Sequence, residues 1–111
     1  MKPKIITNSQ LLDRLHKAAK TANCKRFANS ICSAMPMFWR MHFSEVYEDR
    51  GKVYFEFIVQ NRSYFIEIDY YRVSLLNENS EVLESTILSK NKMFKKIFVD
   101  FEKKIDKNLL M

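Results

Sequence analysis

The chain has 111 residues, of which 19 are Lys or Arg and 13 are Asp or Glu, so its formal net charge is +6. This length suits a single domain with one hydrophobic core, and we expect residues 1–111 to form one. No apolar run is long enough for a secretory signal or a transmembrane helix, because the longest uncharged run, 27–39, is broken by polar residues and Pro36. We therefore expect a cytoplasmic protein that does not enter a membrane.

Two helices are predicted in the first third of the chain. Asn8 or Ser9 can cap the first helix, because a short polar side chain accepts hydrogen bonds from the free amides of a first turn. Apolar residues then recur at helical spacing over 10–22, and a second set, out of phase with the first, follows over 24–35. Pro36 ends the second helix, since a proline steers the residue before it away from helical geometry.

A hydrophobic period of two begins at Met37 and predicts the strands of an antiparallel sheet. The first two strands form a hairpin around Asp49, Arg50 and Gly51, the only glycine of the chain. A second turn, of two residues at 61–62, would bring four apolar pairs onto one face of the sheet. The pairs specify that register, because a slip of one residue would turn the whole set to water.

The remaining strands and a last helix complete the predicted fold. Tyr70 and Tyr71 interrupt the alternation of the third strand and predict a bulge within it. Turn-forming residues at 77–80 precede a fourth strand, and helical spacing returns from Asn91 onward. The predicted fold class is α+β: two N-terminal helices, a four-stranded antiparallel meander and a C-terminal helix, with the helices packed on one face of the sheet. The predicted core combines the apolar faces of the sheet and the last helix: Phe55, Phe57, Ile66, Ile68, Phe94, Phe98 and Phe101.

Acidic residues gather on the opposite face of the predicted sheet. In this register Glu56 lies directly opposite Glu67, and His42 lies diagonally beside Glu56 if the first turn has three residues. Such a cluster could hold a metal or perform acid–base chemistry. It could also be a solvated face whose acids are neutralised by Arg40 and Arg72, and we expect this second arrangement, because structural charge networks are common.

Other motifs for catalysis or metal binding are missing from the sequence. His16 and His42 are the only histidines, and the close ligand pairs of zinc sites are absent. Cys24 and Cys32 are about 12 Å apart on one predicted helix, which is too far for a disulfide. We expect both to be small core residues of a protein in a reducing compartment. One glycine cannot build a phosphate-binding loop, and no nucleophile motif occurs. We therefore expect neither an enzyme nor a metal or cofactor site.

Residues 15–35 invite comparison with a helix-turn-helix. Lys25 and Arg26 would open its second helix, but Asn29 falls where an apolar contact between the helices is expected, and the turn has no glycine. The sheet also lacks the glycine-aromatic signature of RNA-recognition domains. Neither module is favoured.

The distribution of charge is the strongest functional signal in the sequence. Residues 1–40 have eight basic residues and one acid, for a net +7, whereas 41–90 have a net −4 and 91–111 a net +3. Helices on one face of the sheet would make one side of the molecule basic and the other acidic. The expected binding residues lie on the helical side: Arg14, Lys17, Lys20, Lys25, Arg26, Lys92, Lys95, Lys96 and Lys103.

Segregated charge without catalytic motifs predicts a non-enzymatic protein that binds an acidic macromolecular surface. We expect a small inhibitor or adaptor that blocks or bridges a larger protein complex. By analogy of size and charge alone, phages and mobile elements use such domains against host machinery such as a CRISPR effector. The alternative is a nucleic-acid-binding protein whose basic helices contact phosphates and whose affinity falls steeply with salt. The identity of the partner and the oligomeric state are not specified by the sequence.

Overall fold

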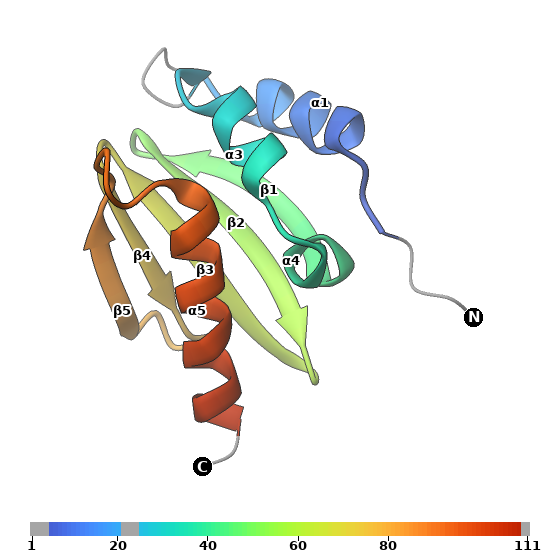
Figure 1. Cartoon of the computed structure of the whole chain (residues 1–111). Helices are drawn as coiled ribbons and strands as arrows, with labels where there is room; N and C mark the ends of the chain where they lie inside the picture. The colour runs from blue at the N-terminus through green and yellow to red at the C-terminus, as the bar shows by residue number, and fades with distance from the viewer. Residues whose placement is uncertain (1–4, 21–24, 110–111) are drawn as a thin grey trace.

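The computed structural model describes residues 5–20 and 25–109, which form an α+β domain. Four helices and five strands lie in these ranges, in place of the two N-terminal helices, four strands and last helix that were predicted. The strands form one antiparallel sheet in the order β1-β2-β3-β4-β5, and the helices cover one of its faces (Figure 1). No helix in the described part is long and apolar enough to cross a membrane.

The helices are α1 (Asn8–Ala18), α3 (Ala28–Ala34), α4 (Met37–His42) and α5 (Phe94–Leu109). Thr7 caps α1, in place of the predicted Asn8 or Ser9. Its hydroxyl accepts a hydrogen bond from the Gln10 amide at 3.2 Å, and the Gln10 side chain accepts from the Thr7 amide at 3.0 Å. This reciprocal capping box satisfies two amides that would otherwise lack partners.

The prediction of a strand at 37–42 is wrong, because this segment forms α4. Pro36 stands at its N-cap, and the Pro36 carbonyl accepts hydrogen bonds from the amides of Trp39 and Arg40 at 3.1 and 3.2 Å. The Trp39 ring is fully buried, and its Nε1 donates to the Phe98 carbonyl of α5 at 2.9 Å. This tertiary contact outweighs the weak local alternation that suggested a strand.

The strands are β1 (Phe43–Asp49), β2 (Lys52–Val59), β3 (Arg62–Asp69), β4 (Arg72–Leu76) and β5 (Val82–Ile87). The fifth strand arises because Tyr70 and Tyr71 form a two-residue turn between β3 and β4 rather than a bulge. Asp69 pairs with Arg72, and Tyr70 has a left-handed φ of 55°. The predicted third strand is therefore two strands.

The predicted register of the central hairpin is shifted by two residues. Its turn consists of Gln60 and Asn61, both with left-handed φ (50° and 63°), which is the geometry of a tight type I′ turn. Glu56 consequently lies opposite Phe65, and Glu67 lies opposite Tyr54. A shift by two keeps every side chain on its original face, so the apolar pattern alone cannot detect it.

The predicted core is confirmed. All seven core residues named from the sequence are at most 6% exposed, and they pack with the buried faces of α1 and α3 in one cluster. Trp39 joins the sheet to α5, with its ring centroid 4.7 Å from that of Phe57 and 6.0 Å from that of Phe98. The helices therefore leave the opposite face of the sheet uncovered.

Candidate functional site

One end of the sheet collects segments that are far apart in the chain. In an antiparallel meander alternate turns share an end, so the β1–β2 turn (Arg50, Gly51) and the β3–β4 turn (Tyr70, Tyr71) lie together. The chain after β5 arrives at the same end, because the Leu88 amide donates to the Tyr71 carbonyl at 2.7 Å.

Three helical segments reach this end as well, at the upper left of Figure 1. After α1, the Lys20 amide donates to Oε1 of Glu48 at 3.0 Å, which fixes the chain beside the end of β1. Just before α3, the Arg26 guanidinium lies 4.5 Å from the centroid of the Tyr71 ring and 4.6 Å from that of Phe27. Phe27 also meets Phe94, the first residue of α5, with ring centroids 5.7 Å apart.

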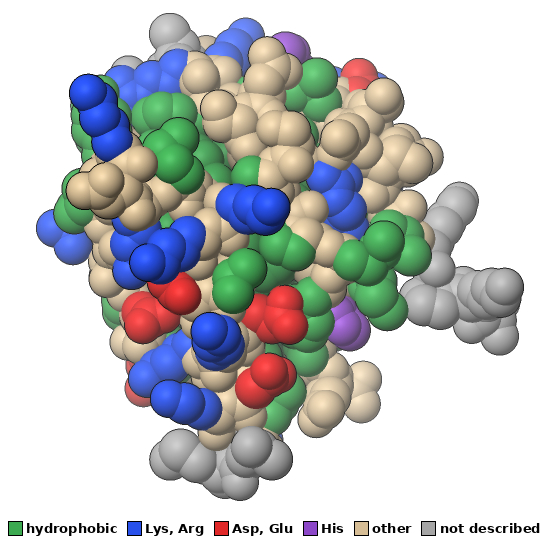
Figure 2. All heavy atoms as spheres, viewed as in Figure 1, with side chains coloured by type: hydrophobic (Ala, Val, Ile, Leu, Met, Phe, Trp, Pro, Cys, Tyr) green, Lys and Arg blue, Asp and Glu red, His purple; other side chains and the backbone are tan. Residues whose placement is uncertain are grey.

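The side chains at this end are mainly cationic. We call the following eight residues the cationic end: Lys20, Lys25, Arg26, Arg50, Lys90, Lys92, Lys95 and Lys96. All but Lys92 are exposed, and Lys92 pairs with Asp100 at 3.4 Å. Figure 2 shows Lys and Arg side chains gathered over the upper left of the helical face, whereas most acidic side chains in view lie over the lower half. The result is a region of positive potential at one pole of the domain.

Six of the nine predicted binding residues belong to the cationic end: Lys20, Lys25, Arg26, Lys92, Lys95 and Lys96. The other three lie apart from it. Lys17 pairs with Asp13 at 3.0 Å, and Lys103 lines a groove beside Glu84 on β5. Arg14 extends from α1 over the ring of Phe43 at the start of β1, with Cζ 5.8 Å from the ring centroid.

Arg50, Lys90 and the two turn tyrosines were missed by the sequence analysis. Arg50 and Lys90 occupy turns, and only the meander brings them beside the helix termini. If the sequence analysis had assigned Tyr70 and Tyr71 to a turn, it would have placed these two tyrosines at the cationic end. In the structure, Tyr70 is 62% exposed and Tyr71 is 53% exposed.

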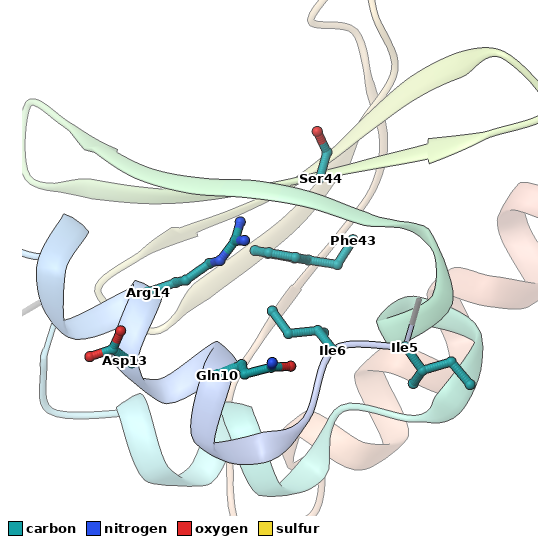
Figure 3. Close-up of a pocket in the computed structure, with 7 residues that line it drawn as sticks. All are labelled: Ile5, Ile6, Gln10, Asp13, Arg14, Phe43 and Ser44. Carbon is teal, nitrogen blue, oxygen red and sulfur yellow. The ribbon is translucent and has the colours of Figure 1, made fainter. Parts of the chain in front are cut away.

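Arg14 also lines a hollow of about 320 Å³ between α1 and β1 (Figure 3). Ile5, Ile6 and Phe43 form much of its apolar lining. Figure 3 shows Ser44 and Asp13 on opposite sides of the hollow, pointing away from each other.

The cluster of Glu56, Glu67 and His42, which was the less expected of the two arrangements, does not form. His42 ends α4 and packs its ring on Phe38, with centroids 5.0 Å apart. The first turn has two residues, so the partner of Glu56 across the hairpin is Glu45. Within 5–20 and 25–109, no three His, Cys, Asp or Glu side chains lie close enough to hold a metal ion.

The uncovered sheet face is acidic, as predicted from the negative net charge of residues 41–90. It presents five carboxylates, Glu45, Asp49, Glu56, Glu67 and Asp69, and two cations, Lys52 and Arg72. Lys52 pairs with Asp69 at 3.9 Å, and Arg72 is the register partner of Asp69. The role expected for Arg40 is wrong: its guanidinium donates to the carbonyls of Met35, Cys32 and Ile6 on the helical side.

Two stacked tyrosines lie among these acids. The rings of Tyr47 and Tyr54 are 5.2 Å apart at an interplanar angle of 16°. Burial raises the pKa of Tyr54 to about 12, and the hydrogen bond that its hydroxyl donates to Glu67 adds to the rise. Burial and the surrounding carboxylates also raise the pKa of Tyr47. Both phenols therefore stay protonated at neutral pH.

Two further predictions concern the N-terminal helices. Cys32 is buried, as expected for a core residue, and burial raises the pKa of its thiol to about 11, so it is not a reactive thiolate at neutral pH. Cys24 and the turn of the compared helix-turn-helix lie outside the described residues. Asn29 is exposed rather than packed between helices, and Arg26 stacks on rings of its own domain.

Comparison of the chain with protein-family models, curated proteins and solved structures gave no match in any of the three. The charge and shape of the surface are therefore what bear on function.

Proposed function

We propose that this chain is a non-enzymatic binding protein that engages an acidic surface of a larger macromolecular complex, as a small inhibitor or adaptor. The cationic end carries this proposal. Its eight cations come from four separate parts of the chain: the end of α1, the start of α3, the β1–β2 turn and the segment that leads into α5. Complementary potential of this kind steers association and sets the orientation of a partner.

The placement of cations on α5 supports a role beyond solubility. The first turn of α5 contains no acid, and it carries Lys95 and Lys96 instead. A helix N-terminus has a positive partial charge, which disfavours a nearby cation by roughly 0.3–1 kcal/mol. Solubility is served equally well by mixed charges. A negatively charged partner would offset this cost.

The uncovered sheet face supports the adaptor form of the proposal. Its acids are interspersed with exposed apolar side chains, including Ile58, Val82 and Ile87. Two surfaces of opposite sign allow one domain to contact two unlike partners. An inhibitor used by a phage or mobile element against a host complex such as a CRISPR effector fits this proposal, on size and charge alone.

A second candidate is a nucleic-acid-binding protein. One observation favours it: Tyr70 and Tyr71 are exposed beside the cations, and phosphate-binding surfaces often pair cations with aromatic rings. In this case affinity would fall by orders of magnitude between low and moderate salt.

The test is a triple reversal, Lys25→Glu, Lys95→Glu and Lys96→Glu, with a matched control of equal charge change at Lys17, Lys103 and Lys107. All six side chains are exposed, so both variants should fold. Partners are recovered from the native host with and without nuclease. Loss of the partner in the first variant alone supports the proposal, and nuclease sensitivity selects the second candidate. If both variants bind the partner as well as the parent does, the proposal that the cationic end binds the partner is wrong.

A further inference from the structure

We propose that the cationic end binds single-stranded nucleic acid, with phosphates at its lysines and arginines and a base stacked on Tyr70. This inference rests on the second candidate of the proposed function, a nucleic-acid-binding protein, and it names the kind of nucleic acid and the residue that would stack a base. The ligand is a free single strand.

The composition of the cationic end favours phosphates over the carboxylates of a protein. Six of its eight cations are lysines. Lysine is depleted in protein–protein interfaces, where Arg and aromatic residues are enriched. Phosphate backbones, in contrast, are bound by lysine as a compact point charge, and release of their counterions drives the association. The positive partial charge of the α5 N-terminus adds to the positive potential there.

The β3–β4 turn supplies a place for a base. The Tyr71 ring is held by the Arg26 guanidinium at 4.5 Å and by the edge of Phe27, with ring centroids 5.9 Å apart. Tyr70 beside it is 62% exposed, and in the described part of the chain it has no ring or cation contact. A fixed Tyr71 and an accessible Tyr70 ring are suited to stack an unpaired base. Duplexes hide the faces of their bases, so the geometry points to a single strand.

The backbone at Tyr70 offers a position for a test. Its φ of 55° is in the left-handed region, where Gly or Asn is preferred over a bulky side chain. Arg50 (φ 54°) and Gln60 (φ 50°) take the same conformation at the first position of the other two-residue turns, so this φ reflects the geometry of the turns.

The same feature gives a test that does not depend on loss of folding. Tyr70→Asn removes the ring and suits the left-handed backbone better than tyrosine does. Gln60→Asn is the matched control, because Gln60 is exposed and has a φ of 50° at the first position of the β2–β3 turn, at the opposite end of the sheet. Both variants should unfold at the same or a higher urea concentration than the parent.

Binding is measured by fluorescence anisotropy of labelled oligothymidylate and oligouridylate of about twelve nucleotides. The same measurement uses a duplex of equal length and a polyglutamate peptide. We expect the single strands to bind most tightly and Tyr70→Asn to raise their Kd about tenfold, since stacking of one base corresponds to a roughly 5- to 150-fold change. Gln60→Asn should leave Kd unchanged. Each cation removed from the cationic end should flatten the salt dependence by about 0.7 in logarithmic slope.

Three results would overturn the inference. If Tyr70→Asn binds the single strands as tightly as the parent, stacking on Tyr70 is excluded. If polyglutamate or a captured protein binds through Lys25, Lys95 and Lys96 while the oligonucleotides do not bind, the inference fails and the proposed function stands. If no acidic ligand binds and the triple reversal changes nothing, both fail.

Discussion

Glu45 faces Glu56 across the β1–β2 hairpin, and replacing Glu45 with Lys should stabilise the protein. The two residues are direct register partners. Like charges at such positions destabilise by roughly 0.2–1 kcal/mol, and opposite charges stabilise by a similar amount. The substitution changes repulsion to attraction, but Glu45 is exposed to water. We therefore expect a gain of about 0.5–1 kcal/mol, or about 2–5 °C in Tm.

Urea unfolding followed by Trp39 fluorescence measures this gain, because Trp39 is the only tryptophan and is fully buried. A double-mutant cycle with Glu56→Gln isolates the interaction between the two positions from other effects of each change. Most of the coupling should disappear at about 1 M NaCl, where the screening length is only about 3 Å.

Ser44→Lys is the discriminating control. In a hairpin with a three-residue turn, Ser44 rather than Glu45 would face Glu56, and the coupling would move to Ser44. A cycle that shows coupling at Ser44 and none at Glu45 would refute the register on which this reasoning depends. Glu67→Gln, in contrast, should not stabilise, because Glu67 lies opposite Tyr54 and accepts its hydrogen bond.

Three further predictions concern the core and the titrating groups. Phe57→Ala should lower the free energy of unfolding by about 3–5 kcal/mol, because Phe57 is fully buried; a loss below about 1 kcal/mol in urea unfolding would contradict this. The pKa of Tyr54 is raised from 10.0 to about 12, so its stabilising contribution is complete below pH 10 and is lost as the pH rises through about 12. Ultraviolet titration should show this ionisation at lower pH in Glu67→Gln, and an unchanged curve would exclude the hydrogen bond. In a Cys24→Ser chain, Cys32 should react with a thiol reagent at neutral pH only as fast as the protein opens, and rapid labelling would show that the thiol is accessible.

Side-chain periodicity predicted the faces of the sheet and of the last helix, but not the positions of the turns. Phe57 and Phe98 were assigned to the core because burial of one face imposes a period on each element. Turns are harder, since Gln60 and Tyr70 take left-handed φ without the Gly or Asn that usually signals it. Moving the turn by one residue, from 61–62 to 60–61, shifts the strand register by two residues and leaves the apolar pattern intact. In the sequence alone, the turn at Tyr70 and Tyr71 looks the same as a bulge.

Tertiary contacts explain the other differences. The helix at 37–42 depends on burial of Trp39 against α5, a contact that spans 59 residues and that no local pattern reveals. The candidate site follows the same principle. Charge counting found Lys25 and Lys95, whereas Arg50 and Lys90 join them only because alternate turns of the meander share one end.

The agreement between strand order and chain order also bears on how the molecule folds. Each strand pairs with the one before it, and three of the four connections are turns of two residues. Pairing the two strands of each hairpin therefore closes only a short loop, and the loss of chain entropy is small. A sheet built from such local pairings has a low contact order for a β-rich topology, and low contact order accelerates folding. We expect refolding within milliseconds, with its rate sensitive to the left-handed residues of the turns.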